Sequence, residues 1–148
     1  MSLEEKIENE IKAGMKSRDK IKISTLRMVK NDIVNLKLDH GKKKITDEEI
    51  IKILQRQVKQ HKDSIEQFEK GKRQDLVDKE KKELGILLNY MPEQLSDKEL
   101  EKIAGDALRE AGISGKSAMG KVMKIVMEKV RGKADGKRVS MIVSRMLG

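Results

Sequence analysis

Lysine and arginine are concentrated near the C-terminal end of the sequence, which is where chemistry with a charged ligand is most readily expected. Residues 116–148 hold nine of them against two acids, Glu128 and Asp135, which is a net charge of +7. The whole chain of 148 residues has a net charge of +9, so the preceding residues are close to neutral. A local excess of positive charge attracts polyanions. The charge distribution therefore predicts a phosphate-binding surface in residues 116–148.

Residues 112–117 read GISGKS and are similar to a nucleotide-binding phosphate loop that lacks its first glycine. Glu110 stands where that glycine is required, and we expect a helix rather than a strand before the loop. We therefore interpret the segment as a helix end followed by a helix start, capped by Ser114 or Ser117. The N–H groups of such a start, beside Lys116, could bind one phosphate of a nucleic acid.

Residues 132–138, which read GKADGKR, form a second basic segment between two expected helices. Asp135 is expected to be the N-cap of the final helix. The segment is either a solvated linker or part of one basic surface that contacts a sugar–phosphate backbone, and the sequence leaves both interpretations open. On the second interpretation, the candidate nucleic-acid-binding residues are Lys116, Lys121, Lys124, Lys133, Lys137 and Arg138.

No catalytic residue, metal site or cofactor is predicted. The acids Asp47, Glu48 and Glu49 lie in the first turn of an expected helix, where negative charge is stabilised anyway. Neither His40 nor His61 has a second histidine three or four residues away, and the chain has no cysteine. The only aromatic residues are one phenylalanine and one tyrosine, so we do not expect stacking on single-stranded bases. The kind of recognition that we still expect is contact with the backbone and the shape of a folded or duplex nucleic acid.

The elements that position these residues are predicted to be helices throughout, because apolar residues recur at helical spacing in seven segments. The first four helices form a bundle and the last three a compact module. Ser2, Thr46 and Ser96 each begin a capping-box pattern with a glutamate three residues later. The expected ranges are about 2–16, 19–39, 47–69 and 73–90, then segments that contain 100–111, 119–130 and 139–147.

Pro92 is the only proline and marks the expected boundary between the two parts. We predict a helical bundle over residues 1–91 and a three-helix module over residues 92–148. A module of this size buries little surface, so we expect it to depend on the first part for stability. Its methionines at positions 119, 123 and 127 fall on the apolar stripe and are expected in the core.

The sequence also suggests a location. Its first residues, MSLEEKIENE, are charged from the fourth onward and do not resemble a signal peptide. No apolar run approaches the roughly 20 residues that a membrane-spanning helix needs. We therefore expect a cytoplasmic protein without membrane contact, and the sequence leaves its oligomeric state open.

Five segments resemble the GatB/YqeY family, and especially its small stand-alone YqeY-like members. They read KDSIEQF (62–68), RQDLV (73–77), YMPEQLS (90–96), MGKVM (119–123) and GKADGK (132–137). The resemblance covers nearly the whole chain, and Met91 replaces the leucine that is usual before the proline. It implies two helical subdomains divided near Pro92. It also implies that the residues from about 96 are similar to the tail of the B subunit of glutamyl/aspartyl-tRNA amidotransferase, which helps to hold the body of the tRNA.

The activity of that parent enzyme is carbon–nitrogen ligation with glutamine as amido donor, and this chain lacks the length and residues for it. We therefore expect a non-catalytic tRNA-binding accessory protein. One alternative is a protein–protein adaptor that docks on an amidotransferase or another translation component. A further alternative is a participant in carbon–nitrogen ligation, as the family resemblance would suggest.

Overall fold

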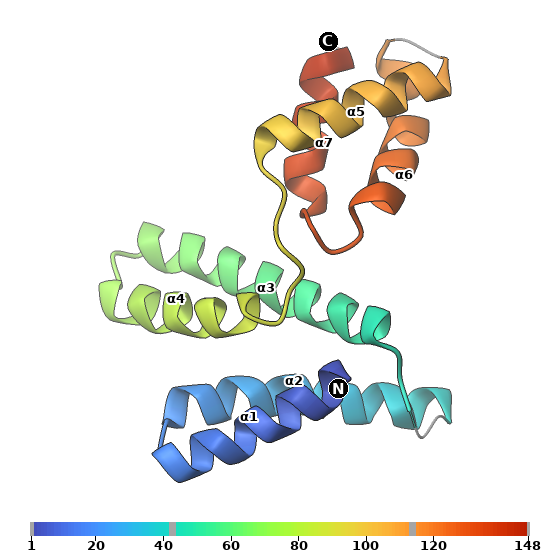
Figure 1. The fold of residues 1–148 in the computed structure, drawn as a ribbon. Coiled ribbons are helices and arrows are strands. Elements are labelled where there is room, and N and C mark those ends of the chain that lie inside the picture. Colours follow the sequence, from blue (N-terminus) through green and yellow to red (C-terminus); the bar gives the residue numbers. More distant parts are fainter. Residues whose placement is uncertain (1, 42–43, 113–114, 148) are drawn as a thin grey trace. The chain divides into compact units, whose positions relative to one another are not determined.

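A computed structural model describes residues 2–41, 44–112 and 115–147 (Figure 1). These residues form seven α-helices and one short 3₁₀ helix, and no strand, which confirms the predicted all-α class. The first four helices are α1 (Leu3–Ser17), α2 (Lys20–His40), α3 (Asp47–Lys70) and α4 (Gln74–Leu88). They are followed by α5 (Asp97–Ala111), the 3₁₀ turn η1 (Lys116–Ala118), α6 (Met119–Val130) and α7 (Gly136–Leu147).

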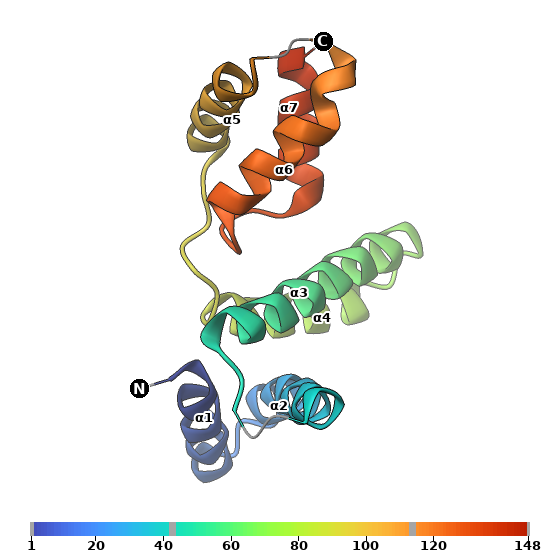
Figure 2. The same ribbon diagram turned by 90° about the vertical axis from the view of Figure 1, so that its right-hand side faces the viewer.

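The contacts within the chain divide it into two compact units, residues 1–91 and residues 92–148. In the first unit, α1 pairs with α2 and α3 forms a hairpin with α4, while α2 also packs against α3 and α4 (Figures 1 and 2). The buried faces of the helices meet in one core, whose largest members are Ile7, Leu26, Ile33, Ile50, Leu54 and Leu87.

The start of α3 shows why the helix boundaries could be read from the sequence. Thr46 accepts a hydrogen bond from the backbone N–H of Glu49 at 3.2 Å, and the Glu49 carboxylate accepts one from the Thr46 N–H at 3.2 Å. This reciprocal pair satisfies two N–H groups that have no partner within the helix. Ser2 and Ser96 likewise accept from the N–H three residues later, at 3.2 Å in each case.

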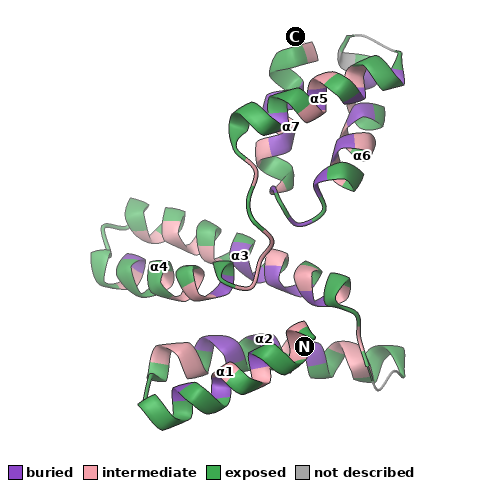
Figure 3. Cartoon of the chain, viewed as in Figure 1, coloured by how far each residue is buried: buried purple, intermediate pink, exposed green. Residues whose placement is uncertain are grey.

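The second unit has its own core between α5, α6 and α7, marked by the buried positions in Figure 3. Met119, Met123 and Met127 are half-buried against this core, as expected, whereas Met141 and Met146 are exposed. The other members follow the predicted helical spacing and include Leu100, Ala104, Ala107, Val122, Val126, Val130, Val139, Ile142 and Val143.

Two sequence-based expectations were wrong in detail. Ser117 does not cap α6, because the 3₁₀ turn intervenes and the N-cap position is Ala118, whose N–H donates to the Gly115 carbonyl at 3.0 Å. The other candidate cap, Ser114, lies outside the described residues. In α4, the apolar spacing places Leu88 among the buried leucines, but Leu88 is 38% exposed, whereas Val77 near the helix start is buried.

No helix among the described residues combines the length and the apolar character needed to cross a lipid bilayer.

Candidate nucleic-acid interface

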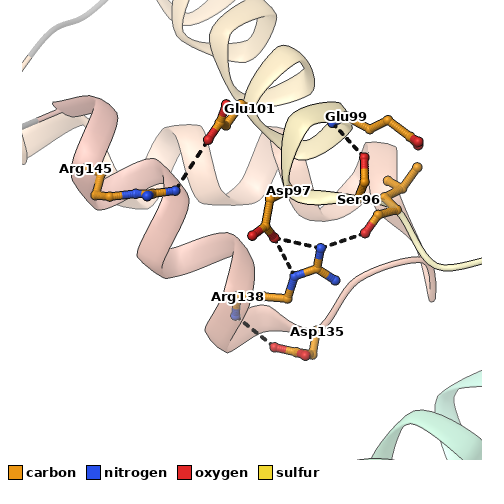
Figure 4. A network of polar contacts seen from close by, with 8 residues as sticks. Ser96, Asp97, Glu99, Glu101, Asp135, Arg138 and Arg145 are labelled. Carbon is orange, nitrogen blue, oxygen red and sulfur yellow. Dashed lines mark hydrogen bonds and ion pairs between the residues drawn. The ribbon is translucent and has the colours of Figure 1, made fainter.

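The basic residues of α6, α7 and the loop between them include two groups, which differ in whether they have a carboxylate partner. The first group lies beside α5, which carries more acids than bases. Lys129 pairs with Glu110 at 2.9 Å, Arg138 with Asp97 at 2.8 Å and Arg145 with Glu101 at 3.5 Å (the last two in Figure 4). These ion pairs join α6 and α7 to α5. The basic side chains of this group therefore already have carboxylate partners within the unit.

Arg138 has the most extensive of these contacts. Its Nε and Nη2 donate to Asp97 Oδ1 at 2.9 and 2.8 Å, and Nη2 also donates to the Leu95 carbonyl at 2.7 Å (Figure 4). Its backbone N–H donates to Asp135 Oδ1 at 2.8 Å, which confirms Asp135 as the cap of α7. Arg138 therefore joins the start of α7 to the start of α5, and a phosphate would have to compete with these partners.

The loop between α6 and α7 is held by hydrogen bonds from the segment that precedes α5. The Leu95 N–H donates to the Lys133 carbonyl at 2.8 Å, and the Gln94 side chain donates to the Gly132 carbonyl at 2.9 Å. Ala134 is buried in the core of the same unit. These contacts hold the backbone of the loop, and the backbone in turn positions the side chains that project from it.

The second group consists of four exposed lysines that form no ion pair with any residue the structure describes: Lys121, Lys124, Lys133 and Lys137. Their exposure and their freedom from carboxylates leave their ammonium groups available to an external anion. The side chain of Lys116, the remaining candidate apart from Arg138, lies outside what the structure describes.

The structure places these four lysines on neighbouring parts of one helix–loop–helix segment. Lys121 and Lys124 lie three residues apart, on the side of α6 away from its buried valines. Lys133 projects from the fixed loop, and Lys137 lies in the first turn of α7. At 1.5 Å per residue, the distance from Lys121 to the end of α6 is about 14 Å.

Gln94 and Asp97 were not among the residues expected at this site. Both act on the basic segment indirectly, since Gln94 holds the loop and Asp97 holds Arg138. The signal for Gln94 was present in the family motif at residues 90–96. No local pattern pointed to Asp97, because its partner lies 41 positions away.

Curated relatives align with between about half and nearly all of the chain. A protein of Pyrenophora tritici-repentis named "Altered inheritance of mitochondria protein 41, mitochondrial" is 32% identical over 146 residues, which cover 97% of this chain and 80% of the relative. A protein of the same name from Kluyveromyces lactis is 34% identical over 84 residues, covering 57% of this chain and 45% of the relative. An uncharacterized protein of Schizosaccharomyces pombe is 32% identical over 96 residues, covering 65% and 77%.

These names contradict the cytoplasmic location that the sequence led us to expect, because the relatives are named as mitochondrial proteins. The expectation rested on the charged N-terminus and on the absence of a secretory signal pattern. Neither feature distinguishes the cytoplasm from the interior of an organelle.

The family assignment rests on the length of the match as well as on these identities. A model of the family described as "Yqey-like protein" matches residues 4–147, which extend from the first turn of α1 to the end of α7. The chain therefore belongs to the YqeY-like protein family.

Proposed function

We propose that this chain is a non-catalytic accessory protein that binds tRNA through α6, α7 and the loop between them. The observation that carries the proposal is the set of four exposed lysines without carboxylate partners, on a segment whose backbone is held by Gln94 and Leu95. The lysines Lys121, Lys124, Lys133 and Lys137 would contact phosphates, and Arg138 would hold the segment in position. We call these four lysines the lysine surface.

The recognition would depend on charge and shape. Lysine ammonium groups act as point charges on phosphates and carry no base specificity of their own. The second unit contains no aromatic residue, so stacking on bases would not contribute. A folded RNA suits this kind of contact, and the resemblance to the tail of the amidotransferase B subunit favours tRNA.

The salt dependence of binding tests the proposal. With four phosphate contacts, the logarithm of the association constant should fall with the logarithm of the salt concentration at a slope of about −3 to −4, taking 0.7 to 0.9 per contact. Fluorescence anisotropy of labelled tRNA, titrated with the full chain at several salt concentrations, measures this slope. Binding that does not respond to salt would contradict the proposal.

Charge reversal locates the contacts. The double variant Lys133→Glu/Lys137→Glu should weaken binding by roughly 30-fold or more near 0.15 M salt and lower the slope by about 2, because two contacts are lost. Lys98→Glu/Lys102→Glu is the matched control, since it makes the same charge change on exposed residues of α5 in the same unit. An equal loss of affinity in both double variants would show that net charge alone drives the binding.

A protein–protein adaptor is the second candidate, and the first unit supplies an observation for it. Met15, Met28 and Leu38 are large apolar side chains that are 53%, 58% and 74% exposed there, so a protein partner could cover them. Co-precipitation with a purified amidotransferase or other translation component, after nuclease treatment and without tRNA affinity, would favour this function. Amide transfer by the isolated chain, assayed with glutamine and ATP, tests the carbon–nitrogen ligase alternative, and we expect none.

A further inference from the structure

The first unit contains a cluster of metal-ligand type that belongs to neither proposed function. His61 lies on α3, and Glu80 and Glu83 lie on α4. Their ligand atoms all lie within 4.8 Å of one another. The imidazole Nδ1 forms a close contact with Glu80 Oε2 and lies 3.6 Å from Glu83 Oε2.

The hairpin of α3 and α4 explains why these residues meet. The two helices are joined by a three-residue turn at residues 71–73, so position 61 and position 83 are equally far from its middle. In an antiparallel pair such positions come opposite each other. Glu80 precedes Glu83 by three residues and therefore lies on the same side of α4. The backbone thus brings all three side chains to one place.

The two carboxylates of this cluster face the same imidazole. Among the described residues, neither carboxylate pairs with a lysine or an arginine, and the nearby Lys81 pairs with Glu69 at 3.8 Å. Two carboxylates at this separation repel each other unless a cation lies between them. An imidazolium has one N–H at Nδ1, so it can donate to only one of the two carboxylates. A divalent ion would satisfy both.

The geometry and the ligand types fit a transition metal ion. Ligand atoms around tetrahedral zinc lie about 3.4 Å apart, given metal–ligand distances of about 2.0–2.2 Å. The 3.6 Å distance from His61 to Glu83 is close to this value, and rotation of the carboxylate ends would bring the remaining pairs into range. Imidazole together with carboxylates suits Zn²⁺ and its neighbours in the first transition row, whereas Ca²⁺ and Mg²⁺ prefer oxygen ligands alone.

The three side chains of the cluster are partly buried, which leaves a bound ion accessible to solvent. The side chains of His61, Glu80 and Glu83 are 13%, 20% and 14% exposed. Water can reach the cluster and occupy the positions that three protein ligands leave open. We propose that His61, Glu80 and Glu83 form a binding site for a divalent transition metal ion of the zinc class, which joins α3 to α4.

The test uses the full chain after treatment with a chelator. Titration with Co²⁺, followed by its visible absorption, and calorimetric titration with Zn²⁺ should each give one ion per chain. Binding should also raise the thermal midpoint of unfolding, because the ion stabilises only the folded hairpin. His61→Gln should weaken binding by at least about tenfold, which is the low end of the loss for residues that support a metal site.

The second histidine supplies a matched control. His40 is exposed at the end of α2, and His40→Gln removes an imidazole without touching the cluster, so metal affinity should be unchanged. The wild-type chain with labelled histidines gives a readout that does not depend on any variant folding: Mn²⁺ should broaden the imidazole signals of His61 and leave those of His40 sharp. Absence of binding at millimolar metal, affinity that survives His61→Gln, or broadening of His40 instead would each overturn the proposal.

Discussion

Arg138 illustrates, at the scale of one residue, how a basic side chain can stabilise the fold through contacts within the protein. Its guanidinium donates to Asp97 and to the Leu95 carbonyl and is 35% exposed. We expect Arg138→Ala to lower the free energy of unfolding by about 1–2 kcal/mol, since hydrogen bonds to charged groups are lost and solvent screens part of their effect. Denaturant unfolding of the full chain measures this change.

Arg145→Ala is the comparison for that variant. Arg145 is 67% exposed and its contact with Glu101 is 3.5 Å long, so its loss should cost no more than about 0.5 kcal/mol. Equal effects of the two substitutions would mean that the contacts of Arg138 contribute no more than a surface ion pair.

Tyr90 gives a pH-dependent prediction. Burial, and to a lesser extent the charge of Glu10, raise the pKa of Tyr90 from its ordinary value of 10 to about 12. The folded chain therefore holds this proton more tightly than the unfolded chain. The corresponding stability is fully present below pH 10 and is lost as the pH rises through 12. Tyr90 is the only tyrosine and tryptophan is absent, so the absorbance of tyrosinate reports this group alone.

We expect the tyrosinate signal of the folded chain to appear near pH 12, and that of the chain in denaturant near pH 10. Glu10→Gln should lower the folded value, because a nearby negative charge disfavours the phenolate. A folded titration indistinguishable from the denatured one would show that the Tyr90 hydroxyl is solvated.

The contacts of single residues were the part of the site that the sequence could not predict. The basic neighbours of Arg138 in the sequence make it a phosphate-binding candidate, yet its partner Asp97 lies on another helix. The sequence does not point to His61 as a metal ligand, because no second histidine lies one helical turn away. Its neighbours Glu80 and Glu83 come from the other helix of a hairpin. The short turn between α3 and α4 sets which residues of the two helices lie opposite each other. That register could have predicted that Glu80 and Glu83 lie near His61.

At the scale of elements, the capping residues allow a direct test. Thr46 accepts a hydrogen bond at the start of α3, whereas Ser117 makes no such bond at the start of α6. Thr46→Ala should therefore lower the free energy of unfolding by about 1 kcal/mol, and Ser117→Ala should change it by only a few tenths. Thermal unfolding of both variants measures the difference. A larger loss for Ser117→Ala would contradict the observed helix start.

The helices themselves were predictable because their signals are local. Apolar residues at intervals of three and four define each buried face, and the caps at Ser2, Thr46 and Ser96 define three of the starts. The details that escaped prediction depend on packing between elements. In α4, for example, the apolar spacing alone does not show that Val77 is buried and Leu88 exposed.

At the scale of the whole molecule, ion pairing within the second unit determines which of its basic side chains lack a carboxylate partner. In the second unit three acids of α5 pair with basic residues of α6 and α7, and the lysine surface consists of exposed lysines of the same segment that have no such partner among the described residues. The net charge of the sequence cannot reveal this division, because it counts paired and unpaired lysines alike. The fold is therefore needed to identify the four unpaired lysines, whereas the excess of positive charge in residues 116–148 can be read from the sequence alone.

The separation of the two cores leads to a prediction about the second unit alone. Twelve buried residues of residues 92–148 form a cluster of their own. The sequence suggested that this part depends on the first for stability, but many domains of about 55–65 residues fold alone. We expect residues 92–148, expressed separately, to be helical by circular dichroism and to unfold cooperatively.

If the lysine surface binds tRNA, that fragment should also keep the salt slope of the full chain, since all four lysines and their supports Gln94 and Asp97 are retained. Residues 1–91 provide the matched control and should bind tRNA weakly. A helical fragment that has lost the slope would place the RNA contacts elsewhere, whereas an unfolded fragment would show that the core of this unit is insufficient by itself. The two outcomes are distinguishable, because circular dichroism measures the fold and anisotropy measures the binding.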